Sequence, residues 1–474
     1  MGRRLERYPE YKDSGLPWLG LIPAHWEIQR NGRLFSQRNE NGFPDLPILE
    51  VSLKTGVRVR GLDNQKRKQM MADRAKYKRA VRGDIAYNMM RLWQGAVGVA
   101  PVDGLVSPAY VVAKPHPGTN SRYYAYLLRT AAYMNEVNKY SHGIVTDRNR
   151  LYWDEFKQMP SVFPPPDEQA AIANCLDHHG ALVSRYVRNK RRLIELLKEQ
   201  KKAVIQQAVT RGLDPNVQTK PSGIDWLGDI PAHWEVRPLK RVADVNPPRL
   251  ESGMVGEDEV AFLPMECVGT DGSISPEIRR IAEVFKGFTH FRRSDVIVAK
   301  ITPCFENGKG AFLDTLPTEV GFGSTEFHVL RPRPCTYGKF LYYLSLTPHF
   351  RRLGAQAMVG AAGQQRVPES FVSSFPVALP PLQEQYEIAA HLDARVLVTG
   401  EALACVQREI NLIREYRTRL IADVVTGRVD VRSLAPAVTD VPQSIEDITG
   451  EAAAAEDEEV LPEEAAEEVA IGNE

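Results

Sequence analysis

The sequence has no long apolar run, no paired cysteines and no phosphate-binding glycine loop. None of its hydrophobic segments is long enough to cross a bilayer, and the basic N-terminus MGRRLERYPEYKDSG has no apolar stretch behind it. We therefore expect no membrane helix and no secretory signal, and we place the chain in the cytoplasm. The five cysteines form no CxxC pair, which excludes a zinc ribbon and indicates reduced thiols. Without a GxxxxGK[ST] sequence, nucleotide binding is not expected.

The formal net charge of zero hides an uneven distribution of charge along the chain. Residues 434–474 hold 13 of the 60 acidic side chains and no Lys or Arg, so residues 1–433 carry a net charge of +13. Such a surplus is typical of proteins that contact phosphates, although many other soluble domains share it. The acidic segment has few large apolar side chains. We interpret it as a disordered tail that either solubilises the chain or mimics DNA at the basic surface.

The chain is an internal duplication. SGLPWLGLIPAHWE at 14–27 matches SGIDWLGDIPAHWE at 222–235, and PPPDEQAAIANCLD at 164–177 matches PPLQEQYEIAAHLD at 380–393. A chain of 474 residues has room for about two to four folded units. The duplication therefore predicts two related units, each of which ends in the same kind of element.

Those terminal elements are predicted long helices, over 167–213 and 383–433. Apolar side chains recur there at alternating spacings of three and four, with polar interruptions at His179, Lys190 and Gln200, which is the pattern of a coiled-coil seam. About 44 residues make a helix roughly 65 Å long, which cannot bury an apolar stripe alone. We expect the two helices to pack on each other; the alternative is two unrelated core helices. The predicted seam is Ile172, Leu176, Val183, Leu193, Leu197, Val204, Leu403, Val406, Ile410, Ile413, Leu420 and Val424.

Two segments between the repeated markers, 36–163 and 244–379, diverge in sequence while their landmarks agree. RGDIAYN at 82 corresponds to RSDVIVA at 293, and YYAYLL at 123 corresponds to KFLYYL at 339. Short β-branched runs between Gly, Pro and Asn predict mixed strands and helices in each segment. Reading two different DNA targets requires such an arrangement, because phosphate contacts can be shared while base contacts must differ.

Candidate DNA-reading side chains lie on predicted loops of both segments, since Arg, Lys, Asn and Gln are the residues that meet base edges and phosphates. The stretch GAAGQQR at 360–366 is notable because small residues let a backbone approach DNA closely. For any single candidate, the alternative is an ordinary solvated surface side chain. The candidates are Lys54, Arg58, Arg60, Lys78, Arg79, Arg82, Asn88, Arg91, Gln94, Arg148 and Arg150, then Arg292, Arg293, Lys300, Asn307, Lys309, Gln364, Gln365 and Arg366.

Two further sequence features resemble parts of catalytic sites, and we assign a catalytic role to neither. The sequence NPPR at 246–249 is similar to the Asn/Asp-Pro-Pro-aromatic motif of amino-methyltransferases, but an arginine replaces the aromatic residue and no glycine-rich turn for a methyl donor accompanies it. His25 and His233 occupy equivalent positions of the repeat, which favours packing beside Trp26 and Trp234 over metal binding or acid–base chemistry. We expect neither a catalytic residue nor a metal site in the chain.

The doubled SGxxWLGxIPAHWE motif, the PPxxEQxxIAxxLD helix starts and the two variable segments closely resemble, in this order over residues 8–433, the specificity subunit (HsdS) of type I restriction–modification enzymes. The resemblance implies a mixed α/β (α+β) fold. It has two pseudo-symmetric target-recognition domains, over 1–166 and 214–382, separated by the two helices as an antiparallel coiled coil, with 434–474 as a tail.

The resemblance also implies a division of labour. Each domain would read one half of a bipartite site in double-stranded DNA, and the helices would fix the unread gap. Chemistry would belong to partners: two methyltransferase subunits that use S-adenosylmethionine, and motor-nuclease subunits that use ATP and Mg²⁺. The chain itself would carry no cofactor. Two alternatives remain, a free-standing adenine methyltransferase that uses Asn246, and a coiled-coil scaffold with two protein-binding lobes.

Overall fold

The contacts within the computed structural model divide the chain into two units. Unit 1 comprises residues 1–191 and 407–474, and unit 2 comprises residues 192–406, so the chain passes between units within a long helix each time. The predicted functional division at 166, 213 and 382 stays a prediction. Lys54, Arg148 and the acidic tail lie outside the described residues. The structure describes residues 6–53, 55–60, 74–142, 149–248, 257–361 and 363–434.

Unit 1 is built around an antiparallel sheet of four strands in the order β4-β11-β8-β9. Its central strand β8 has the sequence IAYN with all four residues buried, because the sheet is covered on both faces. The sheet strands are β4 (Phe35–Arg38), β11 (Tyr110–Pro115), β8 (Ile85–Asn88) and β9 (Val97–Val99). The paired strands are β1 (Tyr11–Asp13) with β2 (Leu21–Pro23), β3 (Glu27–Arg30) with β12 (Pro160–Phe163), β5 (Leu49–Ser52) with β6 (Gly56–Val59), and β7 (Lys78–Ala80) with β10 (Gly104–Val106). The short helices are α1 (Asn31–Leu34), α2 (Ser121–Leu128), α3 (Ala131–Tyr140) and α4 (Trp153–Phe156).

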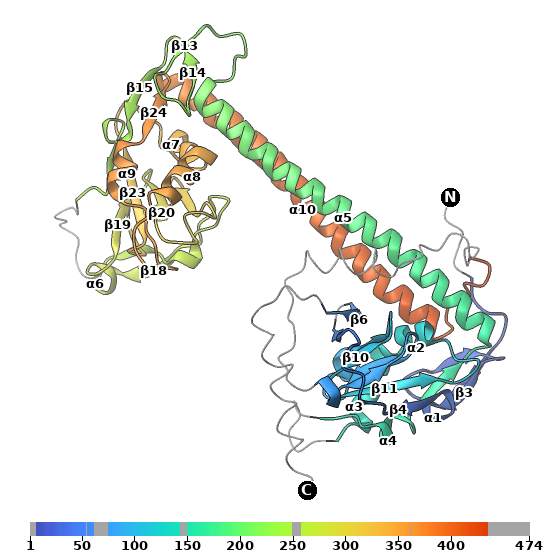
Figure 1. Cartoon of the computed structure of the whole chain (residues 1–474). Coiled ribbons are helices and arrows are strands. Elements are labelled where there is room, and N and C mark those ends of the chain that lie inside the picture. Colours follow the sequence, from blue (N-terminus) through green and yellow to red (C-terminus); the bar gives the residue numbers. More distant parts are fainter. Residues whose placement is uncertain are drawn as a thin grey trace. The chain divides into compact units, whose positions relative to one another are not determined.

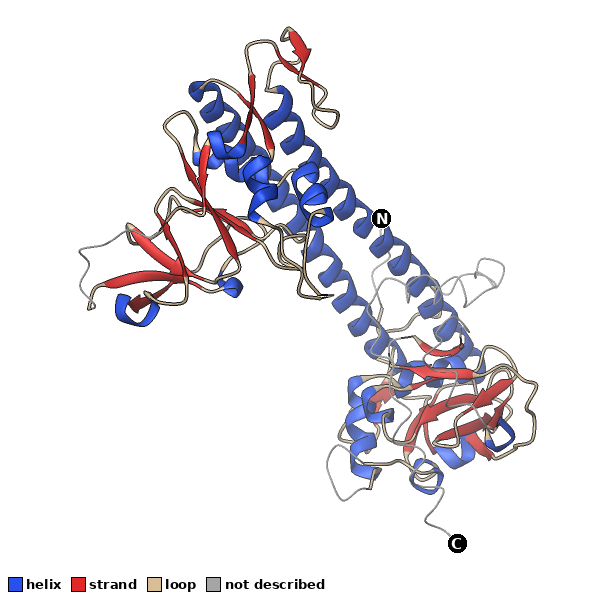
Figure 2. Cartoon of the chain, turned by 60° about the vertical axis from the view of Figure 1, so that its left-hand side comes forward, coloured by secondary structure: helices blue, strands red, loops and turns tan. Residues whose placement is uncertain are grey.

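Unit 2 repeats this strand order as β16-β23-β20-β21, so the predicted shared fold is found in both units. It adds a second sheet, β18-β17-β22-β19, in which β17 and β22 are parallel. The strands are drawn in red in Figure 2. The first sheet has β16 (Ala243–Val245), β23 (Phe327–Pro332), β20 (Val296–Ala299) and β21 (Gly310–Phe312). The second has β18 (Glu277–Arg280), β17 (Glu259–Leu263), β22 (Val320–Gly323) and β19 (Thr289–Arg292). The remaining elements are β13 (Thr219–Pro221), β14 (Asp229–Pro231), β15 (Glu235–Pro238), β24 (Pro376–Leu379), α6 (Ile281–Val284), α7 (Gly338–Ser345), α8 (Pro348–Gln356) and α9 (Glu369–Ser374).

The RGD and RSD landmarks place a buried aspartate at the turn before the central strand. Asp84 precedes β8 and Asp295 precedes β20, and each carboxylate accepts a backbone N–H from three residues upstream. Each also pairs with an arginine, Asp84 with Arg38 of β4 at 2.6 Å and Asp295 with Arg331 of β23 at 2.8 Å. The two units therefore stabilise the same turn with an arginine from different strands.

The two predicted long helices are α5 (Pro166–Arg211, 46 residues) and α10 (Leu382–Val425, 44 residues). At about 1.5 Å per residue, each is about 65 to 70 Å long. Each ends before a left-handed glycine, Gly212 with φ of 73° and Gly427 with φ of 78°. In unit 1 the start of α5 lies beside the end of α10, and in unit 2 the end of α5 lies beside the start of α10, so the pair is antiparallel (Figure 1). Among the described residues no helix is both long and apolar enough to span a bilayer.

Six of the twelve predicted seam residues are buried, five are half-buried and one is exposed. Ile172, Leu176, Val406, Ile410, Leu420 and Val424 are buried, and Val183, Leu197, Val204, Leu403 and Ile413 are half-buried. Leu193 is 38 % exposed, because two helices without further cover bury only a narrow stripe, and its place in the seam stays a prediction. Val187, which was not predicted in the seam, is buried.

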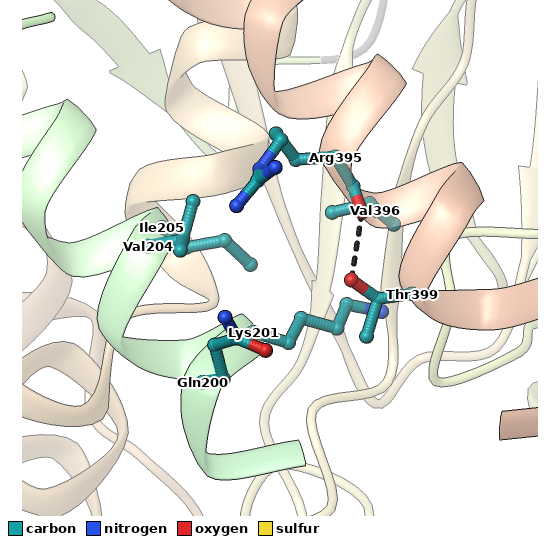
Figure 3. Close-up of a pocket in the computed structure, with 7 residues that line it drawn as sticks. All are labelled: Gln200, Lys201, Val204, Ile205, Arg395, Val396 and Thr399. Carbon is teal, nitrogen blue, oxygen red and sulfur yellow. Dashed lines mark hydrogen bonds between the residues drawn. The ribbon is translucent and has the colours of Figure 1, made fainter. Parts of the chain in front are cut away.

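Polar side chains interrupt the seam, as predicted. Within unit 1 the Nζ atom of Lys190 lies 2.6 Å from Oε2 of Glu409, which also accepts the Tyr186 hydroxyl at 3.0 Å. Within unit 2 a small hollow opens between the helices, and Lys201 and Arg395 extend across it (Figure 3). It is lined by Gln200, Lys201, Val204, Ile205, Arg395, Val396 and Thr399. Burial lowers the pKa of Lys201. The predicted interruption at Gln200 therefore coincides with a gap in apolar packing.

Candidate nucleic-acid interface

The repeated AHW and EQ motifs meet in one joint in each unit. His25 lies beside Glu168, the third residue of α5, and His233 lies beside Glu384, the third residue of α10. The histidine Nε2 to glutamate Oε2 distance is 2.8 Å in both joints. The following tryptophans, Trp26 and Trp234, are fully buried, as predicted for packing residues. These histidines therefore anchor the helix starts.

The glutamine of each EQ motif joins the helix start to the loop before α2 or α7. Gln169 accepts the Asn120 N–H at 2.9 Å and donates to the backbone carbonyls of Gly118 and Pro164. Gln385 makes the same three contacts, with the Tyr337 N–H at 2.8 Å and the carbonyls of Cys335 and Pro380. Both side chains are fully buried with their polar atoms paired, which explains why the duplication preserves them.

The aspartate that ends each IAxxLD stretch binds the α2 or α7 helix directly. Asp177 accepts the Tyr126 hydroxyl at 2.7 Å, and Asp393 accepts the Tyr343 hydroxyl at 2.5 Å. A cation of the same short helix pairs with each aspartate. The duplicated motifs thus build a framework in each unit.

Asn246 of the NPPR sequence is part of this framework too. Its backbone is left-handed, with φ of 48°, and its side-chain oxygen accepts the Val329 N–H at 3.0 Å. Its amide nitrogen donates to Glu369 at 2.8 Å and lies 3.1 Å from Nδ1 of His328. Because every polar atom of this amide is already paired, Asn246 serves to close the turn after β16.

The variable candidates gather where the central strand of each unit ends. In unit 1 the Leu151 N–H binds the Met89 carbonyl at 2.9 Å, which joins the loop after β8 to the chain after α3. In unit 2 the Val367 N–H binds the Lys300 carbonyl at 2.8 Å, which joins the loop after β20 to the chain after α8. These equivalent loop pairs carry Arg91, Gln94 and Arg150 in unit 1 and Lys300, Asn307, Gln364, Gln365 and Arg366 in unit 2. We call each the strand-end loop pair. Asn88, the last residue of β8, is buried, and its side-chain oxygen accepts the Met90 N–H at 2.9 Å.

The remaining candidates lie elsewhere. Arg82, Arg292 and Arg293 precede β8 or β20, at the opposite end of the strand. Arg58 and Arg60 lie on or after β6 and face Glu50, and Arg79 on β7 pairs with Glu40 and Asp103. Two ammonium groups bind backbone carbonyls at 2.9 Å, Lys78 at Tyr110 and Lys309 at Met265. Burial lowers the pKa of Lys78. These contacts direct both lysines inward.

Three residues that contact the strand-end loop pair of unit 2 from neighbouring elements were not anticipated from the sequence. Glu326 precedes β23 and binds Arg366, whose hydrogen bond lowers the pKa of the Glu326 carboxyl. Arg351 of α8 lies under the loop after β20 and donates from Nη1 to the Phe305 carbonyl at 2.8 Å; burial lowers its pKa to about 10. His328 is buried behind the pair. No local pattern marks such residues, because their partners are 39 to 46 positions away.

Acid is expected to destabilise unit 2 through His328. Its Nε2 donates to the Val367 carbonyl at 2.8 Å, and its Nδ1 accepts from the Asn246 amide nitrogen at 3.1 Å. The neutral ring therefore satisfies both contacts, whereas a proton on Nδ1 would face the hydrogen of the Asn246 amide. Burial lowers the pKa of His328 below its usual value of about 6.5. The unfolded chain therefore takes up the proton first, and stability falls as the pH drops through about 6.5, by at most about 1.4 kcal/mol per pH unit.

Denaturant unfolding of the wild type and of His328→Gln at pH 7.5 and pH 5.5 measures this effect. The wild type should lose more stability on acidification than the variant does. An identical loss in both proteins would contradict a role for His328.

Residues 231–399 match the family model Methylase_S, the type I restriction modification DNA specificity domain. The chain is 42% identical over 163 residues to the EcoAI type I restriction enzyme specificity subunit of Escherichia coli, a match that covers 34% of this chain. It is 24% identical over 438 residues to the MjaX specificity subunit of Methanocaldococcus jannaschii, covering 88% of this chain and 96% of the relative. The chain spans only 27% of the EcoAI relative's length.

The fold also has a solved counterpart. A chain solved for the structural basis of complex assembly and conformational transition of the type I R-M system superposes with a TM-score of 0.61 at 16% identity. The superposition covers 85% of this chain and 98% of that one. Residues 231–399 are thus similar to a type I restriction modification DNA specificity domain, and 163 residues of the chain are similar to a specificity subunit of a type I restriction enzyme. The fold of the chain resembles that of a chain solved for the type I R-M system.

Proposed function

We propose that this chain is the recognition subunit of a type I restriction–modification complex, in which each unit reads one half of a bipartite DNA site through its strand-end loop pair. One observation carries the proposal. The two units share a strand order and a joint, yet their loop pairs hold different hydrogen-bonding side chains at the same place in the fold. A shared frame with different readers is what two different half-sites require.

The helices α5 and α10 would fix the unread gap between the half-sites. Each is continuous from a joint of one unit to a joint of the other, 46 and 44 residues long. A continuous helix pair resists bending better than a loop of the same length, so the gap would be constant. We further propose that the two target-recognition domains are pseudo-symmetric, as the repeated joints suggest.

Catalysis would be supplied by partners. Two methyltransferase subunits would dock on the repeated regions and transfer methyl groups from S-adenosylmethionine to adenine, and motor-nuclease subunits would use ATP and Mg²⁺. The relatives that support this proposal are specificity subunits of type I restriction enzymes. Within this chain, the one sequence signal of methyl transfer, Asn246, is committed to hydrogen bonds inside unit 2.

Electrostatics should add affinity without sequence preference. Residues 1–433 carry a net charge of +13, and cations that meet phosphates release bound counterions. Binding of the assembled complex to DNA should therefore weaken as salt rises.

Purified chain, alone and with its methyltransferase partners, tests the proposal against both alternatives. We expect the complex to bind genomic fragments that contain its site more tightly than random DNA, and to methylate them, while the chain alone transfers no methyl group. Methyl transfer by the chain alone would support the methyltransferase alternative. Absence of DNA binding by the complex at every salt concentration would support the scaffold alternative.

A further inference from the structure

Arg366 and Glu326 form a side-on ion pair in the strand-end loop pair of unit 2. The Nε atom of Arg366 lies 2.9 Å from Oε2 of Glu326, and its Nη2 atom lies 2.7 Å from Oε1. The Nη1 atom makes only a long contact of 3.3 Å with the Gln364 carbonyl. The glutamate therefore occupies the Nε edge of the guanidinium, and each Nη atom keeps a proton on the opposite edge.

The backbone that carries this pair is held from two sides. Arg366 exchanges two backbone hydrogen bonds with Val359, at 2.9 and 3.0 Å, across a turn in which Gly360 and Gly363 have positive φ. The Thr302 N–H donates to the Gln365 carbonyl at 2.9 Å, which ties the turn to the loop after β20. The position of the Arg366 Cα is thus fixed by the fold.

This geometry suits a base more than a phosphate. A guanine presents O6 and N7 in the major groove, and the paired Nη protons of an arginine match them. The Glu326 carboxylate offsets much of the arginine charge, which weakens attraction to phosphate of any sequence. It also holds a long side chain in one conformation, so less rotamer freedom is lost on binding.

We propose that Arg366 reads one guanine in the half-site of unit 2 and that Glu326 is the residue that positions Arg366; this inference rests on the proposed function. Arg366 keeps 44% of its side chain exposed for this contact. Arg366 is one of many cations predicted from the sequence, and the proposal rests on its bidentate carboxylate partner and its fixed backbone.

A second arginine of unit 2 provides a matched control. Arg293 lies at the other end of β20 and pairs with Glu319 at 2.5 Å, with its side chain 39% exposed. However, its carboxylate partner contacts Nη1, and its Nε atom donates to the Leu316 carbonyl at 3.1 Å, so the side-on pairing through Nε that Arg366 makes is not formed. Its charge and exposure resemble those of Arg366, whereas the arrangement of its donors differs.

The test maps N6-methyladenine in genomic DNA from cells that express the complete complex with wild-type chain, Arg366→Lys, Glu326→Gln, Arg293→Lys or Glu319→Gln. In the wild type we expect a bipartite motif with one G·C pair whose replacement reduces methylation. Arg366→Lys and Glu326→Gln should both reduce the preference at that one pair, by roughly 5- to 150-fold in the lysine variant. Glu326→Asp, which keeps the carboxylate, should restore part of it. The control variants should keep the wild-type motif.

The outcomes separate this inference from the proposed function. Absence of any bipartite motif in the wild type would overturn the proposed function and this inference with it. A wild-type motif that Arg366→Lys and Glu326→Gln leave unchanged at every position would overturn the inference alone. A uniform loss of methylation at all sites, with no change of preference, would make the pair a structural or phosphate-binding feature and would also overturn it.

Discussion

Exchanging residues 244–379 for the corresponding segment of a related specificity subunit is expected to replace one half of the recognised DNA site and leave the other half unchanged. The exchanged segment contains the whole strand-end loop pair of unit 2, from β16 to β24. It excludes Trp234 and Glu384 of the joint. Gln385 contacts the segment through backbone groups of Cys335 and Tyr337. Asp393 contacts it through the side chains of Tyr343 and Lys339, so the donor segment should carry equivalent side chains at these two positions.

Methylation mapping of the chimeric complex measures the result. The reciprocal exchange of residues 36–163 serves as the control and should change the other half of the site. If either exchange altered both halves, reading of the two half-sites would not be modular.

Replacing Trp234 with alanine is expected to destabilise unit 2 by about 3 to 5 kcal/mol, because it removes a large buried side chain and leaves a cavity. Trp234 is fully buried beside the end of α5, and its ring lies near Gly212. Its Nε1 atom also donates to Glu384 at 3.1 Å. The loss should therefore reach both long helices where they enter unit 2.

Denaturant unfolding, together with hydrogen exchange of amides 205–209 of α5, measures this effect. The control is Leu397→Ala on α10, whose side chain is 63% exposed and should change stability by no more than about 0.5 kcal/mol. Equal stability of Trp234→Ala and the wild type would contradict the structural role of the joint.

The framework could be predicted from the sequence because it is duplicated. Identical residues at two distant positions, such as His25 and His233, revealed a shared element before any contact was known. Both histidines pair with a glutamate at a helix start, and their side chains are exposed, whereas packing was predicted for them. The long helices followed from their apolar spacing, and their observed bounds differ from the predicted ones mainly at the end of α10, which stops at Val425. Repetition and periodicity are read from the sequence itself, so they can be recognised without knowledge of the fold.

The candidate DNA interface could be predicted from the sequence only as clusters of polar and basic residues, and not as individual contacts. A cation in a variable segment is equally compatible with a protein partner and with DNA, and the structure pairs Arg79 and Arg293 with acidic side chains. Glu326 could not be found, because its partner is 40 positions away and a lone glutamate has no pattern. The 38 % exposure of Leu193 could not be predicted, because heptad spacing indicates which face of a helix is apolar and does not indicate how far its partner covers that face.

The central claim, that this chain directs methylation to a bipartite DNA site, is tested most directly by sequencing N6-methyladenine in genomic DNA with and without its gene, while the partner methylation gene is kept intact. We predict that one motif with two specified halves and a constant gap loses methylation when the gene is absent and regains it when the gene is restored. Methylation that is unchanged at every motif, in cells shown to contain the assembled complex, would contradict the claim.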